Sequence, residues 1–214
     1  MNADKLRACL HQRGSRFWAG MADRKIKDDG FRVIARKDGE RVKLYSRPGN
    51  DLTYRFPLIV EGLARLRSRS CIIDGEAVAC SDDGIALFER IRYRRFDSSV
   101  FMYTFDLIEL NGDDLRREPL EWRKAALEHL LARTGYGVRL NEHLEAEGPL
   151  VFEHACRMGL EGIVSKRKGS WYSSGRSRDW LKAKNPKAPA VTRLAEEDWD
   201  RSWSSSASRR PSPR

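Results

Sequence analysis

The sequence predicts an α+β fold in which antiparallel sheets are flanked by helices. Segments in which every second residue is apolar indicate half-buried strands, and segments with apolar residues three or four positions apart indicate amphipathic helices. Both kinds of segment occur along the 214 residues, 40% of which are hydrophobic, and the sequence has no internal repeat. These observations favour one soluble globular domain with irregular ends.

The first clear element is a hairpin centred on Asp38-Gly39. Alternating segments at residues 31–35 and 42–46 flank this dipeptide, and Asp-Gly between two such segments is a strong hairpin signal. Residues 55–66 then carry apolar side chains at helical spacing, with Pro57 suited to the first turn of a helix. We therefore expect strand, turn, strand and helix in that order.

Two longer strands are predicted in the middle of the chain, followed by a helix. Residues 70–80 and 99–110 are rich in apolar side chains, and Asn111-Gly112 supplies a turn at the end of the second segment. Residues 118–134 place leucines on one side and charged side chains on the other, which predicts an amphipathic helix.

The last part of the patterned region predicts one helix and two closing strands. The helix is expected over residues 149–157, with Gly159 supplying a left-handed cap at its end. Residues 162–166 and 180–184 have the composition of short strands. We therefore expect two strands to close the antiparallel part of the fold.

The predicted domain covers residues 25–199 and is flanked by two less regular segments. Residues 1–24 form a divergent or partly disordered N-terminal segment, in which a short helix is expected at residues 5–12. Residues 200–214 are rich in Ser, Arg and Pro, which predicts a disordered tail.

Charge is the most informative feature of the composition. Lys and Arg number 41 against 31 Asp and Glu, a formal net charge of +10, and such a surplus favours a polyanionic partner. The four cysteines lie far apart and predict neither a zinc site nor a disulfide framework. The sequence shows no signal peptide and no apolar run of the ~18 residues that a spanning helix needs, so we expect a cytoplasmic, nucleoid-associated location.

Lys27 is the first candidate for chemistry. It begins the sequence Lys-Asp-Asp-Gly at residues 27–30, and a lysine at a strand end beside an acidic turn can act as a nucleophile when its amine is deprotonated. The same tetrapeptide also fits an ordinary solvated turn, and short motifs of this kind are often coincidental.

Further polar motifs follow Lys27 in a fixed order. Lys182 and Lys184 are two residues apart, so on a strand they share one face. A nucleotide phosphate between the two ammonium groups would offset their repulsion, and so would exposure to solvent. In chain order the motifs are Arg47 in Ser-Arg-Pro-Gly, Glu76 in Asp-Gly-Glu, Phe105 in Phe-Asp, Glu161 and Lys166 in Glu-Gly-Ile-Val-Ser-Lys, and Lys182 and Lys184 in Lys-Ala-Lys.

This ordered series resembles the covalent nucleotidyltransferase family of ligases and capping enzymes. The text around the motifs, such as DGFRVIARKDG, LYSRPGND and MGLEGIVSKRKGS, looks like the adenylation domain of bacterial end-joining ATP-dependent DNA ligases. The resemblance covers residues 26–199. It implies the ATP-grasp-like nucleotidyltransferase fold of DNA ligases, with no OB-fold domain within this sequence.

The resemblance also implies a role for each motif. Lys27 would attack the α-phosphate of ATP and carry AMP, with Mg²⁺ or Mn²⁺ as the metal, for which Glu161 would be the ligand. Glu76 would hold the ribose, and Phe105 would stack on adenine. The remaining expected contacts are those of Lys166, Lys182 and Lys184 with nucleotide phosphates, Arg32 and Arg47 with DNA and the phosphate at a nick, and Asp29 with the nucleotide.

Some alternatives stay open on the sequence alone. Phe105 also fits a core aromatic residue, and Glu76 and Glu161 fit ordinary turn and helix-end charges. The family usually has glutamate two residues before the nucleophile, where this chain has Lys25. A non-catalytic nucleotide- or DNA-binding remnant of a ligase, an RNA ligase and a guanylyltransferase are therefore alternative hypotheses.

The expected partners follow from the ligase hypothesis. They are nicked or broken double-stranded DNA, with a separate OB-fold or end-joining protein as a further partner and no membrane. Arginines at residues 92, 94 and 95 alternate with Tyr93 and Phe96. This segment fits a DNA-binding surface or a solvated charged face.

Overall fold

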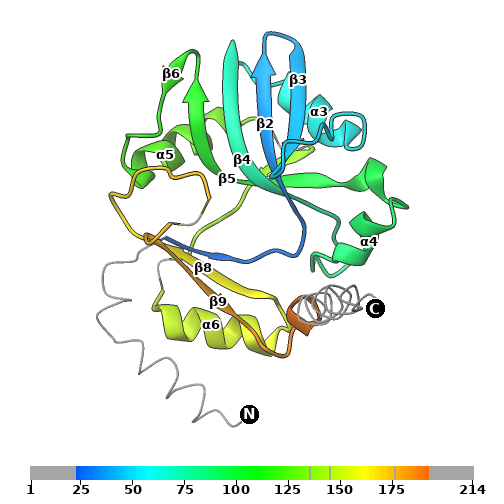
Figure 1. The fold of residues 1–214 in the computed structure, drawn as a ribbon, viewed down its shortest axis with the longest axis vertical. Coiled ribbons are helices and arrows are strands. Elements are labelled where there is room, and N and C mark those ends of the chain that lie inside the picture. Colours follow the sequence, from blue (N-terminus) through cyan, green and yellow to red (C-terminus); the bar gives the residue numbers. More distant parts are fainter. Residues whose placement is uncertain (1–22, 135, 145, 176, 193–214) are drawn as a thin grey trace, which may run out of the picture.

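The computed structural model describes residues 23–134, 136–144, 146–175 and 177–192. Within them two sheets lie one above the other in Figure 1, the larger with β2 to β6 and the smaller with β8 and β9. The helix expected at residues 5–12 and the tail expected at residues 200–214 lie outside the described residues. Among the described residues, no helix has the length and apolar character needed to cross a membrane.

The larger sheet has the order β3-β2-β4-β5-β6, and all of these neighbours are antiparallel. A further short strand, β7, pairs with β5 in parallel. The β2–β3 hairpin turns at Gly39, whose φ of +56° favours glycine. The strands are β2 (Phe31–Asp38), β3 (Arg41–Ser46), β4 (Ser70–Val78), β5 (Phe101–Leu110), β6 (Asp113–Asp114) and β7 (Val138–Leu140).

Two helices lie behind the larger sheet in Figure 1, and a third precedes β5. They are α3 (Pro57–Ala64), α5 (Leu120–Leu131) and the short α4 (Phe88–Arg92), which a 3-10 turn, η1 (Asp97–Ser99), follows. Phe56 and Ile59 from the α3 region, Ile73 from β4 and Leu127 from α5 are completely buried in one apolar cluster. This cluster holds α3 and α5 to the sheet.

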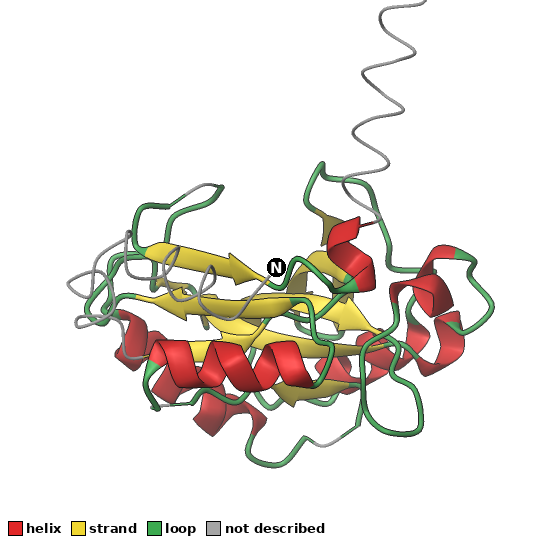
Figure 2. Ribbon diagram, turned by 90° about the horizontal axis from the view of Figure 1, so that it is seen from below, coloured by secondary structure: helices red, strands yellow, loops and turns green. Residues whose placement is uncertain are grey.

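The smaller sheet has the order β1-β8-β9, with β1 (Asp23–Ile26), β8 (Gly162–Lys166) and β9 (Trp180–Lys184), all antiparallel. Helix α6 (Gly148–Arg157) covers one face of it, as Figure 2 shows from below. The helix contributes Val151, Phe152 and Ala155 to a second apolar cluster with Ile163. One face of the smaller sheet is therefore apolar and closed, which leaves the other for the larger sheet.

Most predicted elements are confirmed. Helix α3 begins at Pro57, and α6 ends before Gly159, whose φ is +71°. The helix predicted over residues 118–134 was too long, because α5 begins only after Pro119 and ends at Leu131. Four short elements were not predicted, β1, α4, β6 and β7. The three strands have four residues or fewer and α4 is little more than one helical turn, so none of them shows a hydrophobic period.

A buried network of charged side chains joins the two sheets. Asp106 of β5 accepts from Arg123 of α5 at 2.7 Å and 3.2 Å and from the Lys166 Nζ of β8 at 3.1 Å. The side chains of Asp106 and Arg123 are completely buried, and that of Lys166 nearly so. Although burial opposes ionisation, Lys166 and Arg123 hold the pKa of Asp106 below its ordinary value.

Two further contacts continue this network. The Arg123 guanidinium also donates to the carbonyl oxygen of Ser170, in the loop between β8 and β9. Lys124, the next residue of α5, donates to Asp23 of β1 at 2.8 Å. Helix α5 is therefore tied to two parts of the smaller sheet while its apolar side packs on the larger one.

Replacing Arg123 by methionine is expected to lower the free energy of unfolding by about 3–5 kcal/mol, because it leaves a buried carboxylate with a single cation. Urea unfolding at neutral pH measures the change. Arg116→Met is the matched control, since the Arg116–Asp114 pair is more than half exposed on both sides, and it should change stability far less. Equal effects of the two substitutions would contradict a structural role for the buried network.

Candidate active site

Lys27 lies at the end of β1, directly beside Glu161. Its backbone N–H donates to the carbonyl oxygen of Gly162 at 2.9 Å, and its Nζ lies 2.5 Å from Glu161 Oε1. The lysine side chain is 21% exposed and that of the glutamate only 3%. A ligand can therefore reach the amine, while the carboxylate behind it stays out of water.

The position of this pair depends on Gly162. Its φ is +143°, and a Cβ there would lie 2.0 Å from the carbonyl oxygen of Ala183 on β9. A larger residue would push β8 and β9 apart. Glycine thus allows Glu161 to lie against the end of β1.

Lysines from all three strands share the face of the smaller sheet that is turned away from α6. In the register, Lys25 pairs with Val164, which pairs with Lys182 on its other side, and cross-strand partners point to the same face. Lys27, Lys166 and Lys184 are two residues from members of this row and share its face. The residues in between, among them Ile26, Ile163 and Ala183, pack towards α6.

Carboxylates of the larger sheet face these lysines. Arg32 of β2 pairs with Glu76 of β4 in the register and donates to the Asp74 carboxylate at 3.0 Å and 2.6 Å. The hydroxyl of Tyr172 donates to Asp74 at 3.0 Å. Asp74 and Tyr172 were missed as positioning residues in the sequence analysis. Both hold Arg32, one of the predicted site residues, in place.

The structure brings several predicted residues into one electrostatic environment. Burial raises the pKa of Glu76 to about 7, against the opposing effect of Lys25 and Lys27. Lys182 reaches the surface, but partial desolvation lowers its pKa, and Lys27, Arg32 and Arg47 lower it further. The charges of Lys27, Arg32, Arg47 and Glu76 therefore all act on the Lys182 ammonium.

Phe105 and Lys166 are more enclosed than the rest of the predicted set. Phe105 is 5% exposed. The Lys25 Nζ lies 3.6 Å from the centroid of its ring, and the Lys166 Nζ lies 5.0 Å from it. Lys166 is bound to Asp106 and to the Phe105 carbonyl oxygen. The predicted adenine and phosphate contacts of these two residues stay predictions.

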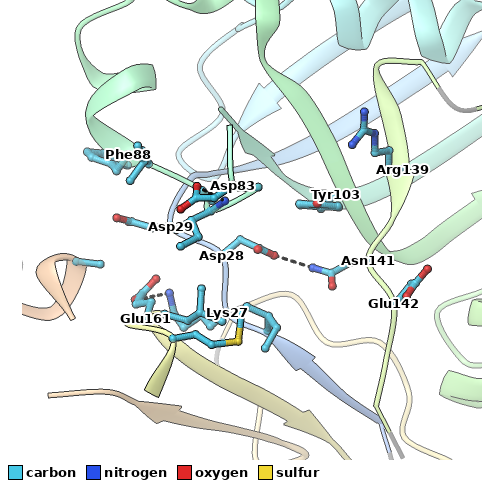
Figure 3. Close-up of a pocket in the computed structure, with 18 of the residues that line it drawn as sticks. Lys27, Asp28, Asp29, Asp83, Phe88, Tyr103, Arg139, Asn141, Glu142 and Glu161 are labelled. Carbon is cyan, nitrogen blue, oxygen red and sulfur yellow. Dashed lines mark hydrogen bonds and ion pairs between the residues drawn. The ribbon is translucent and has the colours of Figure 1, made fainter. Parts of the chain in front are cut away.

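A cavity of about 1250 Å³ opens on the other side of Lys27. Figure 3 shows Lys27 and Glu161 at one side of it, with Asp28 opposite Asn141. Asn141 donates to Asp28 at 2.8 Å, and burial raises the pKa of that carboxyl. Asp29 also lines the cavity, whereas Glu76, Phe105 and Lys182 do not. The Lys27–Glu161 pair therefore lies between the cavity and the lysine-bearing face of the smaller sheet.

Glu161 is the predicted metal ligand, and it is paired with Lys27. In the described part of the chain, no group of three or more His, Cys, Asp or Glu side chains is arranged to hold a metal ion. Asp28, Asp29 and Glu161 nevertheless supply carboxylate oxygens around one cavity, and Mg²⁺ often takes only one or two carboxylates with phosphate oxygens. The residues present fit a metal that a nucleotide brings with it.

Comparison with known proteins gives consistent similarities. A family model described as ATP dependent DNA ligase domain matches residues 9–184. The multifunctional non-homologous end joining protein LigD of Pseudomonas aeruginosa is 36% identical over 164 residues, which are 74% of this chain and 19% of that protein. A DNA ligase of Natronomonas pharaonis is 35% identical over 199 residues, 84% of this chain and 35% of that protein.

Solved structures agree with the sequence comparison. The ligase domain of Mycobacterium tuberculosis LigD has a TM-score of 0.69 and 31% identity, over 78% of this chain and 55% of that chain. A mycobacterial DNA ligase D complexed with ATP and MES gives the same values. The predicted fold class is confirmed. The chain spans only about a fifth to a third of the length of the curated relatives described.

Lys25→Met is expected to stabilise the protein at neutral pH. Burial, and then Lys166, lower the pKa of Lys25 from 10.5 to about 8. The buried Lys25 therefore lowers the free energy of unfolding by its full amount below pH 8. This destabilisation disappears as the pH rises towards 10.5. The gain should reach about 3 kcal/mol at pH 7 and shrink above pH 8.

Urea unfolding at several pH values between 7 and 10 measures this gain. Lys43→Met is the control, because Lys43 is more than half exposed and its loss should change stability little at any of these pH values. A gain for Lys25→Met that does not depend on pH would contradict the electrostatic explanation.

Proposed function

Because the chain belongs to the ATP-dependent DNA ligase domain family, we propose that it forms a covalent lysyl-AMP at Lys27 and takes part in sealing DNA breaks. The proposal depends chiefly on one observation. Lys27 Nζ is accessible, lies 2.5 Å from a buried carboxylate and shares its surroundings with Arg32, Arg47 and Lys182. A reactive amine, a proton acceptor and cations for phosphate are thus present together.

The proposed first step uses these groups in order. Glu161 accepts a proton from the Lys27 ammonium, and the neutral amine attacks the α-phosphorus of ATP. A P–N bond forms while the bond to the β-phosphate oxygen breaks, and pyrophosphate leaves. AMP then passes to a DNA 5′-phosphate, and a 3′-hydroxyl displaces it to close the strand.

The neighbouring cations would stabilise the charge on the transferred phosphoryl group. Lys182, Lys184 and Arg47 lie on exposed positions and can turn towards a phosphate without losing a buried partner. Arg32 is held by Asp74, so it presents a fixed guanidinium. The predicted phosphate contact of Lys166 would require its ammonium to leave Asp106.

Glu76 and the metal complete the proposed site. With a pKa raised to about 7, the Glu76 carboxyl is partly protonated at neutral pH, so it can both donate to and accept from ribose hydroxyls. Mg²⁺ or Mn²⁺ would be held by Glu161 or Asp29 together with phosphate oxygens, where it would supply further charge neutralisation.

The end of α4 and the residues that follow it, together with the neighbouring Tyr54, support a DNA partner. Tyr54 is 76% and Tyr93 64% exposed, and Arg94 and Arg92 lie over these two rings at 5.8 Å and 6.0 Å. Arg55 anchors the segment by donating to Asp97 at 3.1 Å. Exposed aromatic rings beside arginines can stack on bases and neutralise phosphates, so we assign Tyr54, Arg92, Tyr93 and Arg94 to a DNA-contacting patch.

A second candidate function is nucleotide binding without catalysis, which one observation favours. The Lys25 ammonium covers the Phe105 ring, so a base can reach that ring only when Lys25 moves. Detection of covalent AMP separates the two functions. Comparison of RNA nicks with DNA nicks separates an RNA ligase from a DNA ligase.

The larger context is also a proposal. We propose residues 25–199 as the catalytic domain, with broken double-stranded DNA as its substrate and an OB-fold or end-joining protein as its partner. The LigD relatives are described as end-joining proteins, which supports a role in that repair pathway. A DNA substrate is consistent with the nucleoid-associated location predicted from the sequence.

Lys27→Ala is expected to abolish covalent labelling by α-labelled ATP and magnesium on a denaturing gel, because the amine forms the bond to AMP. Lys43→Ala is the matched control, since Lys43 is an exposed lysine of β3 that pairs with Asp51, and it should label as the unchanged protein does. Label retained by Lys27→Ala would show that another residue is the nucleophile. A folded protein without any label would favour the binding function.

The double substitution Tyr54→Ala and Tyr93→Ala is expected to weaken DNA binding by roughly tenfold or more, because each lost stacking contact is worth about 1–3 kcal/mol. Fluorescence anisotropy with a labelled nicked duplex measures the affinity. Trp122→Ala serves as the control, because Trp122 is similarly exposed but lies on α5. An unchanged affinity in the double variant would rule out the patch.

A further inference from the structure

Lys25 covers the aromatic surface on which the proposed function requires a base to lie. Its Nζ is 3.6 Å from the Phe105 ring centroid, which is a cation–π contact. Lys25 is 8% exposed and Phe105 5% exposed. No space therefore remains between them for a base, and a stacked base must have the Lys25 side chain as an immediate neighbour.

The Lys25 ammonium lies against a ring face and among charged groups. Its Nζ contacts the Phe105 ring, and Asp28, Glu76 and Asp74 act on it through their charge. Burial and the nearby Lys166 make the charged form costly there. A ligand that offers an acceptor atom to this ammonium would therefore gain more than the same contact gives in water.

A lysine side chain can distinguish adenine from guanine and hypoxanthine, because it only donates hydrogen bonds. An ammonium group has three N–H donors and no acceptor. Adenine carries an amino group, a donor, at position 6, whereas guanine and hypoxanthine carry a carbonyl oxygen, an acceptor. A base that displaced Lys25 from the ring face would have the ammonium as a neighbour at its edge, because Lys25 and Phe105 are both nearly enclosed. There the ammonium opposes a donor and binds an acceptor.

We propose that Lys25 contacts the edge of the nucleotide base and shifts the preference of the base site on Phe105 from adenine towards purines with an oxygen at position 6. The inference rests on the proposed function in one respect, that a nucleotide base stacks on Phe105. It adds that this chain accepts inosine and guanosine nucleotides more readily than the same site would without Lys25.

A series of substitutions tests the inference through donor and acceptor chemistry. Lysine only donates, the amide of Lys25→Gln donates and accepts, and the carboxylate of Lys25→Glu only accepts. Isothermal titration calorimetry on the full chain gives the dissociation constants of ATP and ITP. ITP differs from ATP in its oxygen at position 6 and lacks the 2-amino group of GTP, so it isolates the contact in question.

The affinity for ITP relative to ATP is expected to fall in the order Lys25, Lys25→Gln, Lys25→Glu. The fall over the whole series should be at least about tenfold, the value of one hydrogen bond to a charged group. Melting curves accompany each variant, and Lys25→Gln alone decides the matter if Lys25→Glu does not fold. Lys43→Gln is the control, because Lys43 is a lysine more than half exposed on β3, and it should leave the ratio unchanged.

The outcomes separate this inference from the proposed function. Binding of both nucleotides with a constant ratio across the series would overturn the role of Lys25 and leave the proposed function standing. A ratio that changes as expected, without covalent label on Lys27, would support Lys25 and overturn catalysis. Failure of every folded variant to bind either nucleotide would overturn the base site itself.

Discussion

The buried contact between Asp106, Arg123 and Lys166 is the constraint on which the geometry of the site depends. In the described part of the chain the two sheets share no strand, so side-chain contacts contribute strongly to their relative position. Arg123 and Lys166 converge on one carboxylate from α5 and β8, and a charged group of this kind accepts only a narrow range of distances. An apolar contact of similar volume is often more stable, but it would tolerate sliding. Sliding would move Lys27 relative to Glu76.

Opposite charges also face each other where the two sheets meet. Lysines of β1, β8 and β9 face Asp74, Glu76 and Asp106 of the larger sheet, and burial shifts the pKa values of Lys25 and Glu76 towards each other, to about 8 and about 7. Small changes in the surroundings can therefore change either protonation state near neutral pH. A triphosphate bound between the sheets would compete with these carboxylates for the same lysines. Nucleotide binding would therefore change the protonation of both groups.

The parts of the fold that could be predicted from sequence are those with a strong local signal. Asp38-Gly39 marks the hairpin, Pro57 the start of α3 and Gly159 the end of α6, because each residue type has a backbone preference that acts without tertiary contacts. Strand β1 could not be predicted, since its residues Asp23, Arg24 and Lys25 are charged and yet buried. Asp23 pairs with Lys124 of α5 and Lys25 lies over Phe105 of β5. These partners lie far along the chain, and no local pattern shows such contacts.

The candidate site divides in the same way. The order of motifs identified Lys27 and Glu161, which are in direct contact, and Glu76 and Lys182, which share an electrostatic environment. The burial of Lys166 and the position of Lys25 over Phe105 could not be predicted, because they follow from how the sheets pack. Asp74 and Tyr172 were missed because their partner, Arg32, lies on another strand and carries no local signal of the pairing.

Strand β1 gives the site a mechanical property. This strand of four residues pairs along its length with β8, and among the described residues its other side has a single bridge, between Arg24 and Leu144. Lys25 and Lys27 are carried on the same segment, so a local opening of a few backbone hydrogen bonds would displace both together. Selection of the base and attachment of the nucleotide would then be lost and regained as one event, on the timescale on which the edge of a small sheet frays.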